Sequence, residues 1–203
     1  MIAIADYGVG NLFSLKSSFA AIGHEVSVTS DAEVLKAADK IILPGVGAFR
    51  DAAEKLRKSG LGQVIKDEAA SGKPLLGICL GMQLLFDKSF EYGEYEGLGI
   101  IPGEIRPIAD VISSDLKIPH IGWNSLDITQ NSLLFSNIRN GDHVYFVHSY
   151  YACTDEKYVY ATAEYGADLT AVVGMDNVFG CQFHPEKSGK VGLAILKAFC
   201  EET

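Results

Sequence analysis

A cysteine between two closely spaced glycines is the clearest chemical signal in the chain. Cys79 lies in residues 77–81, Gly-Ile-Cys-Leu-Gly, between an apolar run and an amphipathic run. This context is typical of a nucleophile elbow, in which a strand turns sharply into a helix at the reactive residue. The first N–H groups of such a helix favour a thiolate and can hold an oxyanion. The pattern predicts a cysteine nucleophile, although a buried, unreactive cysteine at a strand end fits the same residues.

A cysteine nucleophile needs a base, and His184 is the best candidate among the five histidines. It follows an apolar run, residues 178–183, and precedes Pro185 and Glu186. A carboxylate two residues away can orient the imidazole, and Pro185 stiffens the connection and removes a competing N–H donor. Cys79, His184 and Glu186 therefore form a candidate triad. The alternative is an ordinary histidine at a strand end with a solvated Glu186.

A second glycine-rich turn follows the predicted strand at residues 40–43. Gly45 and Gly47 lie in residues 44–49, Pro-Gly-Val-Gly-Ala-Phe. The pair gives only half of a dinucleotide-binding fingerprint, because Arg50 occupies the third glycine position. A flexible backbone that offers an N–H to an oxyanion is the better interpretation. A sharp turn without chemistry fits equally well.

Charge and cysteine spacing exclude several classes of partner. The chain has 17 basic and 26 acidic residues, a net charge of −9, which disfavours nucleic acid and anionic membranes. The four cysteines form no C-x-x-C pair, so we expect free thiols, no metal and no cofactor. A metal site built from His120, His148 and His184 remains an alternative interpretation, but the spacing of these histidines does not suggest one. The chain starts without a basic leader and has no membrane-length apolar run, so we expect a cytoplasmic protein.

Short apolar runs alternate with longer amphipathic runs over the first half of the chain. Leu12, Leu15, Phe19 and Ile22, for example, have helical spacing. The predicted strands are residues 1–5, 25–29, 40–43, 74–78, 145–150, 158–164, 170–175 and 178–183. The predicted helices are residues 12–22, a short helix capped at residues 30–31, and residues 48–59, 61–71, 80–88 and 191–200. This order predicts one α/β domain, residues 1–203, with a mostly parallel central sheet flanked by helices and extra strands in the second half.

Taken together, several segments resemble the class-I, or triad, glutamine amidotransferases. The elbow and the His-Pro-Glu unit are typical of the whole family. Residues 119–124 and 145–150 resemble the branch that serves imidazole glycerol phosphate synthesis in histidine biosynthesis. Ile121 and Cys181 stand where that branch more often has Met and Val. The resemblance rests on residues 6–11, 43–49, 77–86, 117–124, 145–151 and 180–188.

The resemblance implies that the chain hydrolyses glutamine to glutamate and ammonia through a thioester. Cys79 would be the nucleophile, His184 the base and Glu186 the group that orients it. The other implied site residues are Gly47 and Leu80 for the oxyanion, Gln83, Ser149 and Tyr150 for glutamine, and His120, Trp123, Tyr145 and Lys187 for a partner surface.

The resemblance also implies a partner, a cyclase subunit with a (β/α)8 barrel, in a heterodimer. Ammonia would reach it through a tunnel, and the products would be imidazole glycerol phosphate and an aminoimidazole carboxamide ribotide. The chain itself has no P-loop or basic cluster for such phosphates. Gly45 and Gly47 would let the oxyanion N–H turn away in the free subunit, so that the loaded partner gates the reaction.

Three other functions are compatible with parts of the pattern. A triad glutaminase of the anthranilate or guanylate pathway shares the triad but not the segment at residues 119–124. A cysteine hydrolase or peptidase would keep the elbow, but Gln83 and the His-Pro-Glu unit count against it. A non-catalytic glutamine sensor has no use for Cys79, His184 and Glu186 together.

Overall fold

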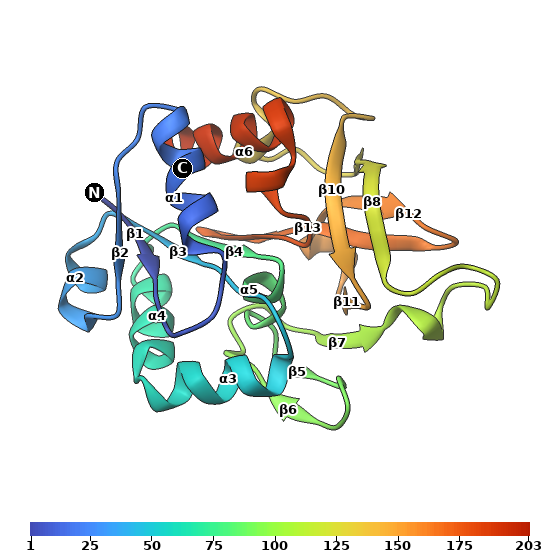
Figure 1. Ribbon diagram of the computed structural model, residues 1–203, viewed down its shortest axis with the longest axis horizontal. Helices are drawn as coiled ribbons and strands as arrows, with labels where there is room; N and C mark the ends of the chain where they lie inside the picture. Colours follow the sequence, from blue (N-terminus) through green and yellow to red (C-terminus); the bar gives the residue numbers. More distant parts are fainter.

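An eight-stranded sheet runs through the middle of the molecule, with helices against both of its faces (Figure 1). The computed structural model describes residues 1–203. In spatial order the strands are β2 (Val26–Thr29), β1 (Ile2–Ala5), β3 (Lys40–Leu43), β4 (Leu75–Ile78), β14 (Val178–Cys181), β13 (Asp168–Met175), β12 (Val159–Glu164) and β9 (Asp127–Ile128). The first five are parallel to one another, and the last three add antiparallel pairs.

Each face of this sheet buries its own core, because alternate side chains of a strand point to opposite faces. Ala3 and Ala5 of β1 lie in one core, and Ile2 and Ile4 lie in the other. The helices over the first core are α2 (Ala32–Ala37), α3 (Phe49–Lys58) and α4 (Leu61–Ala70), and those over the second are α1 (Leu12–Ala21) and α6 (Gly189–Glu202). In Figure 1, α1 and α6 lie above the sheet and α3 and α4 below it.

Two smaller sheets lie beside the antiparallel half of the central sheet (Figure 1). An antiparallel pair is formed by β8 (His120–Ser125) and β10 (His143–His148). A four-stranded sheet has the order β11 (Tyr150–Cys153), β7 (Glu104–Pro107), β5 (Lys88–Ser89) and β6 (Tyr95–Glu96). No helix of the chain is both long and apolar enough to cross a membrane. The α/β class, with a mostly parallel sheet and extra strands in the second half, is confirmed.

The helix predicted at residues 80–88 was wrong in length, since α5 spans only Leu80–Gln83. The carbonyl groups that would continue the helix are bonded to a later segment of the chain. The Leu98 N–H donates to the Leu84 oxygen, and the Ile100 and Ile101 N–H groups donate to the Leu85 oxygen. These long-range bonds compete with helical ones, so the helix ends after one turn.

The single strand predicted at residues 145–150 is two strands in different sheets. β10 ends at His148 and pairs with β8, whereas β11 begins at Tyr150 and pairs with β7. The change of partner occurs at Ser149, whose carbonyl accepts a hydrogen bond from the Ile108 N–H. Because both strands are apolar and adjacent, the sequence pattern did not show the break.

Candidate active site

The predicted elbow is present where β4 meets α5. Cys79 is the residue between them and has φ 54° and ψ −111°, a conformation that side-chain-bearing residues rarely adopt. Its N–H donates to the Cys181 carbonyl of the neighbouring strand β14 at 2.8 Å. The thiol is therefore held at the carboxyl end of β4, beside the start of a helix.

The two glycines of the elbow leave no room for a side chain. A Cβ on Gly77 would lie 2.7 Å from the Met82 Cα, and a Cβ on Gly81 would lie 1.9 Å from the Leu43 carbonyl oxygen. Both contacts are with backbone atoms, which cannot move aside without distorting β3 or α5. The Gly-x-Cys-x-Gly spacing is thus a packing requirement of the turn that presents Cys79.

His184 and Glu186 form a buried hydrogen-bonded pair just after β14. The His184 Nδ1 lies 2.8 Å from the Glu186 Oε1, and the two side chains are 4% and 2% exposed. The His184 N–H donates to the Tyr145 carbonyl, which anchors the histidine backbone to β10. The Glu186 carboxylate leaves its other oxygen, Oε2, without a hydrogen bond. A carboxylate that bonds Nδ1 fixes the ring and leaves Nε2 free for a reacting group.

The surroundings of His184 stabilise its charged form. Burial by itself lowers the pKa of the imidazole, but hydrogen bonding to Cys79 and Glu186 and their negative charges outweigh burial and raise it to about 9. The ring therefore carries a proton at neutral pH, between the sulfur of Cys79 on one side and the carboxylate of Glu186 on the other. This is the ion-pair arrangement that favours a cysteine nucleophile.

The buried amide of Gln182 contacts the thiol and is bonded to a second buried amide, that of Gln83. The Gln182 Nε2 lies 3.8 Å from the Cys79 Sγ, and the Gln182 Oε1 accepts from the Gln83 Nε2 at 3.0 Å. Gln83 also donates to the Tyr150 carbonyl at 3.2 Å. Sequence analysis missed Gln182, although one polar residue within the apolar run 178–183 was a usable signal.

Cys79, His184 and Gln83 line a cleft of about 360 Å³ at the carboxyl ends of β3 and β4. The cleft brings together the predicted residues Gly47, Cys79, Leu80, Gln83, Ser149, Tyr150, His184 and Lys187. It also contains Val46, Glu91, Tyr92, Pro119 and Val147, to which the sequence analysis gave no role, and His148, which it considered only as a metal ligand. Gly47 has φ +94°, and a Cβ added to it would meet no atom within 4 Å, so its backbone faces open space.

Glu91 provides the only carboxylate among the residues that line the cleft. Its Oε2 accepts from the Phe49 N–H, at the start of α3, at 2.6 Å. Burial raises the pKa of Glu91, and this backbone hydrogen bond opposes the rise. Tyr92 packs edge-on against Tyr150, with ring centres 6.3 Å apart. The segment that carries these residues was predicted only as the end of a helix and its flanking loop.

Three of the four residues predicted for a partner surface lie together beside the cleft. Trp123 is 56% exposed, its ring packs edge-on against Tyr145, and the Lys187 Nζ lies 6.0 Å from the Tyr145 ring centre. Ile121, on the same strand as Trp123, is 58% exposed. We call Ile121, Trp123, Tyr145 and Lys187 the β8–β10 face. Exposed apolar side chains gathered in this way often mark a protein interface.

His120 does not lie on this face. It is 3% exposed and packs between Phe146 and Tyr165, with ring centres 4.9 Å and 4.2 Å away. Its Nδ1 is 3.0 Å from the Nε2 of His148. His120, His148 and His184 do not form a metal site. No three or more histidine, cysteine, aspartate or glutamate side chains are arranged to hold a metal ion.

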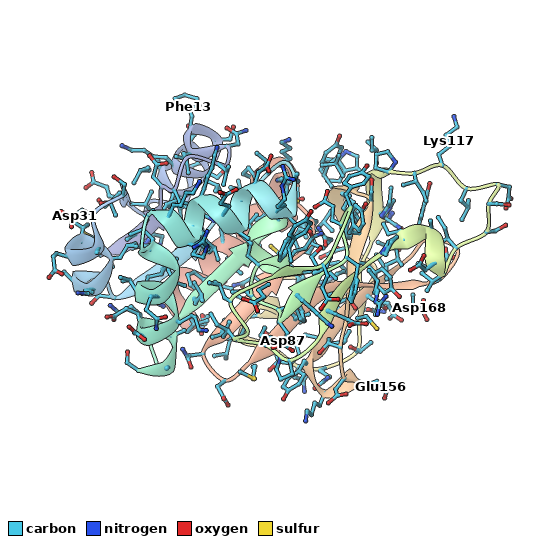
Figure 2. The ribbon with its side chains drawn as sticks, turned by 90° about the horizontal axis from the view of Figure 1, so that it is seen from below. Phe13, Asp31, Asp87, Lys117, Glu156 and Asp168 are labelled. Atoms are coloured by element: carbon cyan, nitrogen blue, oxygen red, sulfur yellow. The ribbon has the colours of Figure 1, made fainter.

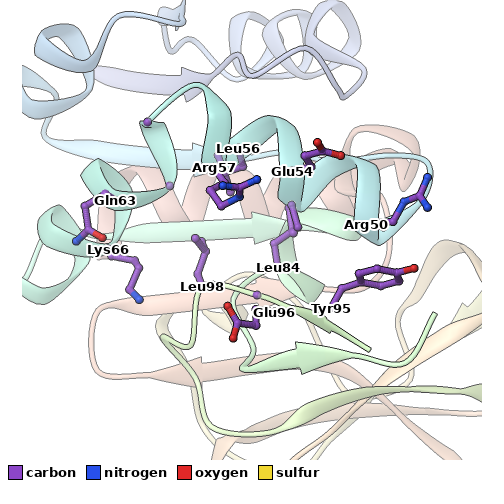
Figure 3. Close-up of a pocket in the computed structure, with 14 residues that line it drawn as sticks. Arg50, Glu54, Leu56, Arg57, Gln63, Lys66, Leu84, Tyr95, Glu96 and Leu98 are labelled. Atoms are coloured by element: carbon purple, nitrogen blue, oxygen red, sulfur yellow. The ribbon is translucent and has the colours of Figure 1, made fainter. Parts of the chain in front are cut away.

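A larger hollow, of about 470 Å³, lies away from the triad between α3, α4 and β6 (Figure 3). Leu56, Leu84 and Leu98 line its floor, and Arg57, Lys66 and Glu96 stand around it. None of its lining residues is a histidine or a cysteine. The smaller cleft at Cys79 is therefore the candidate active site.

Comparison with known proteins agrees with this geometry. The family model "Glutamine amidotransferase class-I" matches residues 3–203. "Imidazole glycerol phosphate synthase subunit HisH" of Caldanaerobacter subterraneus is 52% identical, over 99% of this chain and 98% of the relative. The protein of the same name from Geobacter metallireducens is 49% identical, over 98% and 96%.

Solved structures share the fold at lower sequence identity. A "Crystal structure of glutamine amidotransferase" superimposes with a TM-score of 0.76 at 20% identity, over 98% of this chain and all of the other. The "Structure of PurLQS from Thermotoga maritima" gives 0.76 at 21% identity, over 98% and 96%. With the full-length family match and relatives near half identity, the chain belongs to the class-I glutamine amidotransferases and, among them, to the HisH subunits of imidazole glycerol phosphate synthase.

Proposed function

We propose that this chain hydrolyses glutamine to glutamate and ammonia and delivers the ammonia to a cyclase subunit in histidine biosynthesis. The observation that carries the proposal is the buried unit of Cys79, His184 and Glu186 at the elbow, within an open cleft. The HisH names of the full-length relatives support the pathway. The whole chain, residues 1–203, would act as one amidotransferase domain.

The first half of the reaction forms a thioester on Cys79. The thiol proton of Cys79 resides on Nε2 of His184, and the thiolate attacks the side-chain amide carbon of glutamine. Glu186 holds the ring through Nδ1 and stabilises the imidazolium. The tetrahedral intermediate collapses when His184 returns the proton to the amide nitrogen, and ammonia leaves.

Backbone N–H groups would stabilise the negative oxygen of this intermediate. Leu80 is the first residue of α5, and the first N–H groups of a helix have no partner inside it. Gly47, which also lines the cleft, supplies the second donor in this proposal. Loss of one such donor typically costs about 3 kcal/mol of transition-state stabilisation.

The second half of the reaction releases glutamate. A water molecule enters after ammonia has left, and neutral His184 takes its proton as the water attacks the thioester carbon. The C–S bond then breaks, glutamate departs, and Cys79 is again a thiolate beside protonated His184. Each turnover consumes one glutamine and one water, and it leaves the triad unchanged.

The cleft offers complementary groups for the rest of the glutamine molecule. Gln83, Ser149 and Tyr150 line it and would hold the substrate in place. Glu91 is the natural partner for the α-ammonium group, because it is the only carboxylate in the lining and is tied to the backbone at Phe49. A half-buried carboxylate binds a cation more strongly than a solvated one.

The partner would dock over the β8–β10 face and cover the mouth of the cleft. Ammonia released into water becomes mostly ammonium and loses its nucleophilicity, so direct transfer has a chemical advantage. Trp123 and Ile121 supply exposed apolar area for such a contact. In Figure 2, Phe13 of α1 and Lys117, in the loop before β8, project from the same edge of the molecule. We propose that the partner is a (β/α)8-barrel cyclase.

The partner would also gate the reaction through the oxyanion segment. Gly47 is exposed and has a backbone conformation that glycine adopts easily. In this proposal the free chain rests with the oxyanion N–H turned away, and the loaded partner binds the competent state more tightly.

The decisive experiment measures glutamate release from glutamine. The purified chain is assayed alone, then with its cognate cyclase and the ribotide substrate, with Cys79→Ala as the control. We expect weak activity alone, strong stimulation in the complex, and no glutamine use by Cys79→Ala with ammonia-dependent synthesis retained.

Other outcomes would separate the parts of the proposal. Full activity of the free chain would reject the gating and keep the triad. A folded complex that releases no glutamate would reject the glutaminase function itself.

A further inference from the structure

Two buried histidines beside the cleft have no role in the mechanism above. His120 and His148 are 3% and 6% exposed, and their rings meet through a hydrogen bond of 3.0 Å between Nδ1 of His120 and Nε2 of His148. A buried network of fully satisfied hydrogen bonds holds the groups that belong to it in fixed orientations. The other hydrogen bonds of His120 and His148 show which groups the two rings hold in place.

The partners determine the tautomer of each ring. The His148 Nδ1 lies 2.9 Å from the Tyr150 carbonyl oxygen, which can only accept, so Nδ1 carries the hydrogen and Nε2 accepts. Nδ1 of His120 must then donate, and its Nε2 accepts from the Asn124 Nδ2 at 3.3 Å. The donors therefore all point one way, from Asn124 through His120 and His148 to the Tyr150 carbonyl.

The surroundings keep both rings neutral and in place. Burial lowers the pKa of His148 to about 4, against the effect of the Tyr150 hydrogen bond, and the neighbouring His120 and His184 lower it further. Burial also lowers the pKa of His120. The stacking of His120 on both faces prevents rotation of its ring. A neutral pair is thus maintained next to the protonated His184.

The Tyr150 carbonyl connects this chain of hydrogen bonds to the cleft. It accepts from His148 and also from the Gln83 Nε2. The Gln83 Nε2 uses its second hydrogen on the Gln182 Oε1. Both donor positions of the Gln83 amide are therefore occupied.

The remaining atom of that amide is free to meet the substrate. The Gln83 Oε1 has no hydrogen bond to the protein, and this oxygen is not fully buried. Since Gln83 lines the cleft, this oxygen faces it as an acceptor for an N–H of bound glutamine. A reversed amide would place an acceptor against the Tyr150 carbonyl and lose this orientation.

We propose that His120 and His148 are positioning residues for glutamine: through the Tyr150 carbonyl they hold the Gln83 amide with its oxygen toward the substrate. The proposal rests on the glutaminase function and assigns the histidines no proton transfer. Their effect reaches the reaction only through the placement of Gln83, so they differ from His184, which touches the reacting atoms.

The test uses the complex with the cyclase and two substitutions at His148. His148→Leu removes both ring nitrogens, whereas the amide of His148→Asn can keep a donor near the position of Nδ1. We expect His148→Leu to raise KM for glutamine about tenfold with a smaller change in kcat, as for one lost hydrogen bond. His148→Asn should stay within about threefold of wild type by the same reasoning. His24→Leu, at a half-buried histidine outside the cleft that contacts Glu201, is the control, and ammonia-dependent synthesis should be unchanged in all three.

A double-mutant cycle separates positioning from general damage. In a Gln83→Ala background, His148→Leu should have no further effect on KM, because the group it orients is gone. Additive effects, an unchanged KM in His148→Leu, or equal impairment by His148→Asn would overturn the proposal. Loss of glutamine turnover in the wild-type complex would instead overturn the proposed function.

A measurement on the wild-type chain needs no substitution. Nitrogen-15 NMR of the imidazoles distinguishes the two neutral tautomers, and we expect a hydrogen on Nδ1 of both His120 and His148 near neutral pH. A hydrogen on Nε2 of either ring would refute the proposal, whether or not the variants fold.

Discussion

Replacing Glu186 with glutamine tests whether the carboxylate sets the charge of His184. The substitution keeps the size of the side chain and an oxygen that can accept from Nδ1, but it removes the negative charge. Glu186 is 2% exposed, so little solvent screens its interaction with the imidazole 2.8 Å away. The pKa of His184 should fall from about 9, because Cys79 alone must then offset burial.

The size of the effect follows from linkage between protonation and folding. A pKa of about 9 in the folded chain, against an ordinary value of 6.5, corresponds to about 3 kcal/mol. Because the folded-state value is raised, this stabilisation is complete below pH 6.5 and is lost as the pH rises through 9. Glu186→Gln should therefore destabilise the chain by about 1–3 kcal/mol below pH 6.5. Above pH 9 the substitution should not lower the free energy of unfolding through this interaction, because His184 is then neutral and wild-type Glu186 lacks a cationic partner.

Urea unfolding of the two proteins across this pH range measures the difference directly. The matched control is Glu25→Gln, which changes an exposed carboxylate without an ion pair. Glutamine hydrolysis by the complex should fall about 100-fold in Glu186→Gln, because the imidazolium loses the negative charge that stabilises it. A constant difference in the free energy of unfolding from pH 6.5 to 9 would refute the assignment of the raised pKa to Glu186.

Three further substitutions test the elbow, with one of them as its control, and the partner surface. Gly81→Ala should lower the free energy of unfolding by about 3 kcal/mol or more, because its Cβ would lie 1.9 Å from the Leu43 carbonyl oxygen. Gly62→Ala, whose Cβ would meet Leu56 at 3.4 Å inside α4, should be neutral or stabilising by up to about 1 kcal/mol; equal stability of the two variants in urea would contradict this account. Trp123→Ala should weaken cyclase binding about tenfold or more in calorimetry with an unchanged unfolding midpoint, and unchanged affinity would exclude the β8–β10 face as the interface.

The parallel half of the fold was predictable because its signals are local. The strand at Lys40–Leu43 has the predicted bounds, and the short helix α2 begins after Asp31, whose side chain accepts from the Glu33 N–H. An apolar run of strand length, followed by a capping residue and an amphipathic run, is readable from neighbouring residues alone. The two smaller sheets and the edge strand β9 were not predicted as such, because β5, β6 and β9 have only two residues each and β7 and β8 pair with strands distant in the sequence.

The residues of the site were visible in the sequence, but their environment was not. Cys79, His184 and Glu186 stood out by type and spacing. The parallel pairing of β4 with β14 places the ends of both strands at one edge of the sheet, and so brings Cys79 near His184. Glu91 and Gln182 gave weak signals, because each owes its place in the site to groups far away in the chain.

His120 illustrates the difference most clearly. The family resemblance placed His120 on a partner surface. The fold instead buries its ring between Phe146 and Tyr165, where it forms a hydrogen bond with His148. The sequence by itself determined which groups are available, where strands and helices start, and which turn requires glycine. Only the tertiary structure decided which of those groups are desolvated and which atoms they face. Protonation and hydrogen-bond direction depend on those surroundings, and folding alone supplies them.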